Sequence, residues 1–144
     1  MNSRILHPDI AFPHSVDIQT RFSDYDTFGH VNNNAYMAFL DIGKSEFFRH
    51  IMGRLCTPTD LAAVIVNINV DFLSPALQGE PLRCLTAVVA VGERSFAIYQ
   101  RIINPTTGDV KVQATSTLAG FDLASQSSAP LAQTLRDTLS KLNT

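Results

Sequence analysis

The feature of this 144-residue sequence that most constrains its fold is a single long apolar helix set among strand-like segments. Residues 36–52 carry apolar side chains in one continuous arc at helical spacing, while Phe48 and Met52 fall among the polar residues. A helix lying on a protein surface would not usually place a Phe there, so we expect this helix to be covered on more than one side. Gly53 predicts the end of the helix, because glycine readily adopts the left-handed conformation found at helix ends.

Strand-like segments precede and follow this helix. Residues 14–22 alternate between apolar and polar side chains, which predicts a strand. Four more strands are predicted after the helix, over residues 64–72, 82–91, 95–103 and 110–121. The short turns between the later strands indicate antiparallel neighbours. The segment SQSSAP then predicts a short hinge, and the leucine spacing over residues 129–142 predicts a C-terminal amphipathic helix.

This order of elements indicates an α+β fold, because one helix is inserted after the first strand of an antiparallel sheet. The apolar face of the sheet needs a cover, and the long helix is the element large enough to provide it. We therefore predict a five-stranded antiparallel sheet wrapped around a central helix. The prediction is one domain over residues 1–144, with a core at 14–123 and a short C-terminal helix at about 129–142.

Composition excludes several classes of function. The formal net charge is −2, from 11 Lys and Arg against 13 Asp and Glu, which argues against a nucleic-acid-binding protein. The longest unbroken apolar run, residues 61–66, is far shorter than the roughly 20 residues that span a bilayer. The N-terminus lacks the apolar region of a secretion signal, and two cysteines do not make a disulfide framework. We expect a soluble cytoplasmic protein with no membrane partner.

The polar segment between the first strand and the helix, RFSDYDTFGHVNNNAY, concentrates the chemically useful side chains. Asp24 and Asp26 follow the strand, His30 comes four residues later, and residues 32–34 supply a helix cap. Carboxylates beside the free amides of a helix start suit acyl chemistry, as general base or nucleophile and as oxyanion donors. From the spacing alone, turn and cap formation is the favoured explanation of the same residues, with Arg21 pairing with Asp24. One His beside two Asp does not predict a metal site.

This segment resembles the motif of the 4-hydroxybenzoyl-CoA thioesterase-like branch of the hot-dog-fold acyl-CoA thioesterases. That motif runs Asp-x-Asp-x-x-Gly-His-Val-Asn-Asn and then Tyr, and the matching residues are Asp24, Asp26, Gly29, His30, Val31, Asn32, Asn33 and Tyr36. Residues 66–82 and 92–96 are also similar to the family, so the resemblance covers about residues 14–123. It implies the hot-dog fold, in which the sheet wraps around the central helix.

The resemblance also implies an activity, the hydrolysis of an acyl-CoA thioester to a carboxylate and coenzyme A. Asp26 matches the catalytic carboxylate, either as general base or as nucleophile, and the backbone amide at or near Asn33 would polarise the thioester oxygen. Gly29 and His30 would line the same loop, with His30 shaping it or orienting the substrate. Further candidate substrate-binding residues are Tyr36, which is favoured as a core residue over a catalytic acid, Arg94 near the coenzyme A phosphates, and Ser95.

The implied partner is an acyl-CoA substrate, with no cofactor beyond the coenzyme A that it carries. The resemblance further implies a homodimer with a continuous sheet and the active site at the interface, and it leaves a homotetramer open. Asn67, Asn69 and Asp71 share one strand face, which predicts an exposed or interface surface. A non-catalytic acyl-CoA-binding module is the alternative function, and a hydratase or dehydratase on the same fold is a weaker one. No sequence pattern identifies the acyl group of the substrate.

Overall fold

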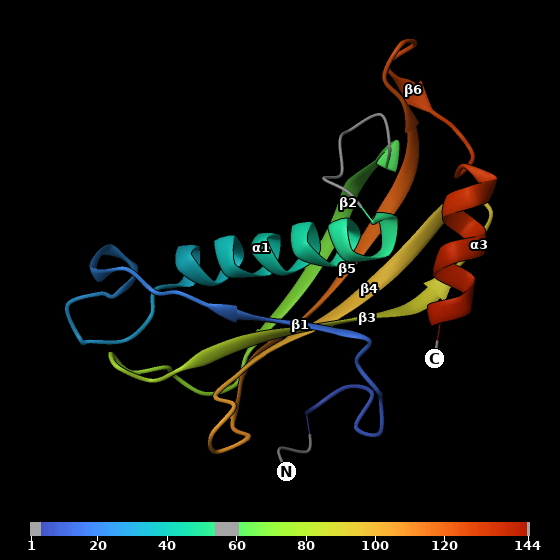
Figure 1. Ribbon diagram of the computed structural model, residues 1–144. Helices are drawn as coiled ribbons and strands as arrows, with labels where there is room; N and C mark the ends of the chain where they lie inside the picture. Colours follow the sequence, from blue (N-terminus) through green and yellow to red (C-terminus); the bar gives the residue numbers. More distant parts are fainter. Residues whose placement is uncertain (1–3, 54–60, 144) are drawn as a thin grey trace.

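A computed structural model of the protein describes residues 4–53 and 61–143. The elements follow the order β1 (His14–Ile18), the 3-10 helix η1 (Phe22–Asp24), α1 (Asn33–Met52), β2 (Ala63–Phe72), β3 (Leu82–Val91), β4 (Ser95–Ile103), β5 (Val110–Asp122), β6 (Ser127–Ser128) and α3 (Gln133–Leu142). Figure 1 shows α1 lying across one face of the sheet, with α3 beside the end of β3 and the start of β4. None of these described helices is long and apolar enough to cross a membrane.

The five long strands form one antiparallel sheet in the order β1-β3-β4-β5-β2. This confirms the predicted sheet wrapped around a central helix. A sixth strand, β6, was not predicted, because a strand of two residues has no readable period. It folds back against the end of β5, where Phe121 pairs with Ser128 and Asp122 with Ser127. The segment predicted as a hinge therefore contributes a short strand to the sheet.

The first strand is shorter than predicted, ending at Ile18 instead of residue 22. Its pairing partner sets this limit, because Ile18 lies opposite Leu82 and β3 begins at Leu82. The residues beyond turn away into η1. There Asp24 accepts hydrogen bonds from the Arg21 amide at 2.7 Å and from the Arg21 guanidinium at 3.1 Å, which confirms the predicted Arg21–Asp24 pair.

Helix α1 begins three residues earlier than predicted, because Asn32 provides the cap. Its side chain accepts a hydrogen bond from the Ala35 amide at 2.8 Å. Gly53 ends the helix with a φ of 70°, as predicted. Phe48 is only 5% exposed and its ring meets that of Phe96 edge-on, so the helix is indeed covered on more than one side.

The C-terminal helix starts at Gln133, four residues after the predicted start. The preceding residues are held outside the helix because the Ala129 amide binds the Gly120 carbonyl of β5 at 3.0 Å, and the Leu131 amide binds the Glu93 carbonyl of the β3–β4 turn at 3.0 Å. A side chain at Gly120 would collide with the Ala129 carbonyl, so glycine permits this close approach. The predicted apolar face is confirmed, with Leu131, Leu135 and Leu139 buried in the same core cluster as Phe47 and Phe48.

Strand β2 lies at one edge of the sheet and carries exposed apolar side chains. Within the described residues it pairs with β5 and with no other strand. Its exposed large apolar residues are Val64, Ile65, Val66 and Phe72. Asn67, Asn69 and Asp71 are also exposed, as predicted. Natural proteins usually protect such an edge by charge, by shortness or by covering it.

Candidate active site

A tight turn immediately before α1 holds the carboxylate of Asp26. The Asp26 amide donates to the His30 carbonyl at 2.8 Å, and the Gly29 amide donates to the Asp26 carbonyl at 3.0 Å. Gly29 has a φ of 75°, which glycine adopts without a steric penalty. The Oδ1 atom of Asp26 accepts hydrogen bonds from the amides of Phe28, at 2.9 Å, and His30, at 3.2 Å. In the described part of the chain Oδ2 has no hydrogen-bond donor, so it is available to a ligand.

The neighbouring carboxylate, Asp24, has a structural role. It is 3% exposed, and both of its oxygens accept hydrogen bonds from Arg21. Burial acts to raise the pKa of Asp24, but the hydrogen bonds and the charge of Arg21 outweigh burial and hold that pKa below its ordinary value. The carbonyl of Asp24 also accepts a hydrogen bond from the Asn32 amide at 2.9 Å. Asp24 therefore fixes the approach to the helix, and Asp26 is the carboxylate free for chemistry.

A cavity of about 300 Å³ opens beside this turn. Four residues proposed from the sequence line it together: Asp26, His30, Asn33 and Tyr36. Gly29 shapes the same turn without lining the cavity. Four lining residues not proposed from the sequence come from the end of β2 and the loop after it: Phe72, Leu73, Ser74 and Pro75. Their position depends on the β2–β5 pairing, so no local pattern pointed to them.

The start of α1 places backbone amides in the cavity. Asn33 is the first helical residue, and the amides of a first helical turn have no acceptor within the helix. Asn32 accepts the hydrogen bond of the Ala35 amide, while in the described chain the Asn33 amide has no acceptor. The helix dipole adds partial positive charge at this end. An oxyanion bound here would lie beside both the Asn33 amide, as hydrogen-bond donor, and the Asp26 carboxylate.

Tyr36 and His30 form walls of the cavity. The Tyr36 hydroxyl accepts a hydrogen bond from the Ala76 amide at 3.2 Å, and its ring packs 5.8 Å from that of Phe72. Burial raises the pKa of Tyr36 above its ordinary value, so the hydroxyl stays neutral. The main chain of His30 forms an antiparallel bridge with Leu77, which ties the turn to the loop after β2.

Arg94 and Ser95 lie at the opposite end of the sheet from this cavity. Ser95 pairs with Ala119, which in turn pairs with Val64 at the start of β2, whereas the cavity lies at Phe72. Eight residues of strand separate the two positions, a distance of about 26 Å. Arg94 instead reaches Ser128 of β6, at 3.4 Å. A single chain therefore does not bring Arg94 or Ser95 to Asp26.

Comparisons with known proteins identify the family that this chain resembles. The family model of the thioesterase-like superfamily matches residues 20–139 of this chain. The long-chain acyl-CoA thioesterase FadM of Escherichia coli K12 is 28% identical over 131 residues, which cover 87% of this chain and 96% of that protein.

Two solved structures show the same fold. A thioesterase from Thermus thermophilus, complexed with coenzyme A and Zn, has a TM-score of 0.79 at 24% identity and covers 91% of this chain and 95% of its own. A thioesterase superfamily protein from Jannaschia sp. CCS1 has a TM-score of 0.83 at 19% identity, with 95% and 96% covered. These similarities confirm the predicted hot-dog fold.

Proposed function

Because the chain belongs to the thioesterase-like superfamily, we propose that it is an enzyme that hydrolyses acyl-CoA thioesters to a carboxylate and coenzyme A. The observation that carries this proposal is the cavity at the start of α1, which Asp26 and Asn33 line together. A carboxylate with a free oxygen can serve as base or nucleophile in thioester hydrolysis, and an amide without an acceptor can stabilise the oxyanion. Two similarities support an acyl-CoA as the substrate: FadM is a long-chain acyl-CoA thioesterase, and the Thermus thermophilus thioesterase was solved with coenzyme A bound.

Asp26 acts on the thioester carbonyl by one of two routes. As a general base, it takes a proton from water while the water oxygen bonds to the carbonyl carbon, and the C–S bond then breaks as that proton passes to the coenzyme A sulfur. As a nucleophile, its own oxygen bonds to that carbon, coenzyme A leaves as a thiol after protonation, and water then hydrolyses the anhydride. In either route the Asn33 amide donates a hydrogen bond to the developing oxyanion, an interaction worth about 3–4 kcal/mol in comparable sites. The two amides bound to Oδ1 orient the carboxylate before substrate arrives.

The active unit of this proposal is a homodimer joined at the β2 edges. The exposed apolar side chains of β2 favour burial against a second copy, and a two-fold axis makes the two β2 strands antiparallel. The Ala63 end of the partner strand then lies beside the Phe72 end of this one. Because Arg94 and Ser95 lie at the Ala63 end of the sheet, the partner's copies come to the end that holds Asp26. Arg94 would there offer its charge to the coenzyme A phosphates.

A thiol-release assay tests the proposed activity. Wild-type protein is incubated with short-chain, long-chain and aromatic acyl-CoAs, and free coenzyme A is measured with a thiol reagent. We expect hydrolysis of at least one class, and the similarity to a long-chain enzyme makes long-chain acyl-CoAs the first to test. Saturable binding of acyl-CoA without thiol release from any member of the panel would contradict the proposal and indicate a binding module.

A further inference from the structure

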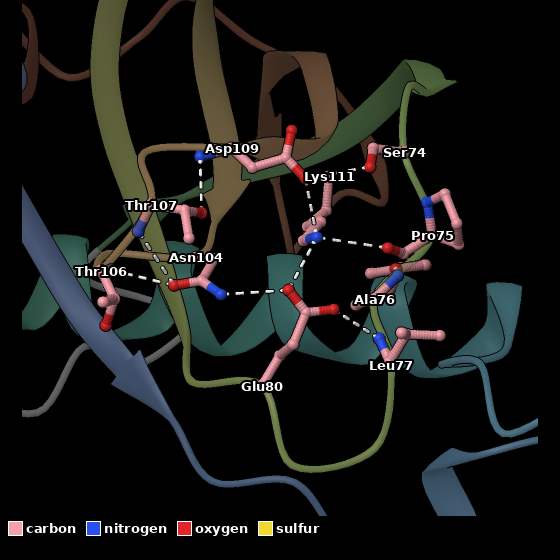
Figure 2. Close-up of polar contacts among 11 residues, drawn as sticks. Ser74, Pro75, Ala76, Leu77, Glu80, Asn104, Thr106, Thr107, Asp109 and Lys111 are labelled. Atoms are coloured by element: carbon pink, nitrogen blue, oxygen red, sulfur yellow. Dashed lines mark hydrogen bonds and ion pairs between the residues drawn. The ribbon is translucent and has the colours of Figure 1, made fainter.

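Lys111 on β5 is a buried cation whose ammonium group is fully hydrogen-bonded (Figure 2). Its side chain is 5% exposed. The Nζ atom donates to the Pro75 carbonyl at 3.2 Å, to Asp109 Oδ2 at 2.7 Å and to Glu80 Oε1 at 2.8 Å. Lysine is seldom buried unless it is paired, and burial of an ion pair is weak evidence for stability by itself. The question is therefore what this cation holds in place.

Both carboxylates beside Lys111 also stabilise the loop that joins β2 to β3. Glu80 belongs to this loop, whereas Asp109 contacts it from the β4–β5 hairpin. Glu80 Oε2 accepts the Leu77 amide at 2.6 Å, while Glu80 Oε1 also accepts Asn104 Nδ2 at 3.0 Å. Asp109 Oδ2 also accepts the Ser74 hydroxyl at 3.0 Å. Figure 2 shows these groups converging on the Lys111 ammonium from the loop and from the β4–β5 hairpin. The main chain adds to this hold, because the amides of residues 73 and 74 donate to the Lys111 carbonyl.

The other side of the same loop binds the Asp26 turn and the start of α1. The Val31 amide donates to the Ala76 carbonyl at 2.9 Å, and the Gln78 amide donates to the Gly29 carbonyl at 3.1 Å. The Ala76 amide donates to the Tyr36 hydroxyl at 3.2 Å. Loop residues 74 and 75 line the cavity directly. Residues 73–79 thus form a wall between the Lys111 cluster, defined as Lys111, Glu80, Asp109 and Asn104, and the candidate active site.

We propose that Lys111 is a positioning residue for the reaction, acting through the loop at 73–80. Lys111 does not line the cavity, but its three hydrogen bonds fix the loop that forms one cavity wall and that holds the Asp26 turn in register with α1. This inference rests on the proposed thioesterase function. A displacement of about 1 Å in such a wall can reduce turnover by about 100-fold.

The test compares Lys111→Met with Lys141→Met, the same substitution at an exposed lysine of α3. Steady-state kinetics use the best substrate from the thiol-release panel, and amide hydrogen exchange is measured on the full chain. For Lys111→Met we expect kcat to fall by about 10- to 100-fold with KM changed by less than about threefold, because the reacting groups lose alignment. Exchange should become faster in residues 73–80 and 28–31 while the centres of β3 and β4 stay protected. Lys141→Met should match wild type in all three readouts.

A second variant covers the case in which Lys111→Met does not fold. Asp109 is 45% exposed at its side chain, and Asp109→Ala removes one Lys111 contact and the Ser74 contact. We expect a smaller fall in kcat, about threefold or more, with faster exchange in the same loop. Wild-type kcat and wild-type exchange in the folded variants would overturn the proposal, as would faster exchange spread evenly over the whole sheet. If wild type hydrolyses no acyl-CoA, the proposed function fails, while the exchange data still decide whether Lys111 holds the loop.

Discussion

At the scale of single residues, the site depends on two carboxylates that stand two positions apart and have different environments. Both oxygens of Asp24 are bound by Arg21, whereas Asp26 uses one oxygen for its turn and keeps the other free. Spacing in the sequence could not separate these roles, because the difference arises from the turn geometry. Solvation then separates them further, since Asp24 is buried and Asp26 is exposed.

Replacement of Asp24 tests its structural role. Asp24→Ala removes the acceptor of both Arg21 hydrogen bonds in a buried position, so we expect a loss of about 1–3 kcal/mol in the free energy of unfolding. Urea denaturation monitored by circular dichroism measures this loss. An unfolding free energy equal to that of wild type would show that Asp24 does not hold the turn.

The charge of Glu80 gives a prediction for the pH dependence of stability. Burial acts to raise the pKa of Glu80, but hydrogen bonds from Leu77, Lys111 and Asn104 outweigh it and lower the pKa from 4.5 to about 2. The folded state therefore binds this proton more weakly than the unfolded state. The resulting stabilisation, about 3 kcal/mol, is complete above about pH 5 and is lost as the pH falls towards 2.

Urea denaturation of wild type and Glu80→Gln at pH 7 and pH 3 measures this effect. We expect wild type to be more stable at pH 7, and the difference to shrink at pH 3 because wild-type Glu80 loses part of its advantage there. A difference that stays constant between the two pH values would contradict this role of the Glu80 carboxylate.

At the scale of secondary-structure elements, the sequence was most informative where a local signal determines the outcome. The Asn32 cap and the Gly53 end of α1 are local effects, and β3 and β4 have the predicted bounds. The early end of β1 depends on where β3 begins, and the late start of α3 depends on hydrogen bonds from residues 129 and 131 to β5 and to the β3–β4 turn. Such long-range hydrogen bonds produce no periodic pattern of apolar residues in the segment whose conformation they determine.

The helix cap at Asn32 gives a prediction at this scale. Asn32→Ala removes the acceptor for the Ala35 amide, so we expect the free energy of unfolding to fall by about 1 kcal/mol. Asn32→Ser, which keeps a capping oxygen, should retain most of the stability. Thermal and urea unfolding of the two variants against wild type measure the effect, and equal losses for Ala and Ser would argue against a cap.

At the scale of the whole molecule, a single chain brings only some of the candidate site residues together. The motif residues Asp26, His30, Asn33 and Tyr36 are close in sequence, so a resemblance found them and one cavity holds them. The wall formed by residues 72–75 became visible only in the folded chain. Arg94 and Ser95 reach the site only in the proposed dimer.

The proposed dimer predicts the effect of a charge on the β2 edge. Val66 is 60% exposed on β2, and Val66→Lys would place a charge in the proposed interface. We expect light scattering after size exclusion to give a dimer for wild type and a monomer for this variant. Leu123→Lys, at an exposed apolar residue beyond the end of β5, is the matched control and should remain dimeric. A monomeric wild type with full thioesterase activity would contradict the shared site.

The most direct test of the account is the turnover of Asp26→Asn on the best acyl-CoA substrate, measured by thiol release. Asp137→Asn, the same change at an exposed carboxylate of α3, is the control. We expect Asp26→Asn to stay folded, to bind acyl-CoA and to lose at least about 100-fold in kcat, because it removes the base or nucleophile, while Asp137→Asn keeps wild-type turnover. A kcat for Asp26→Asn within a few-fold of wild type would contradict the assignment of Asp26 and, with it, the proposed mechanism.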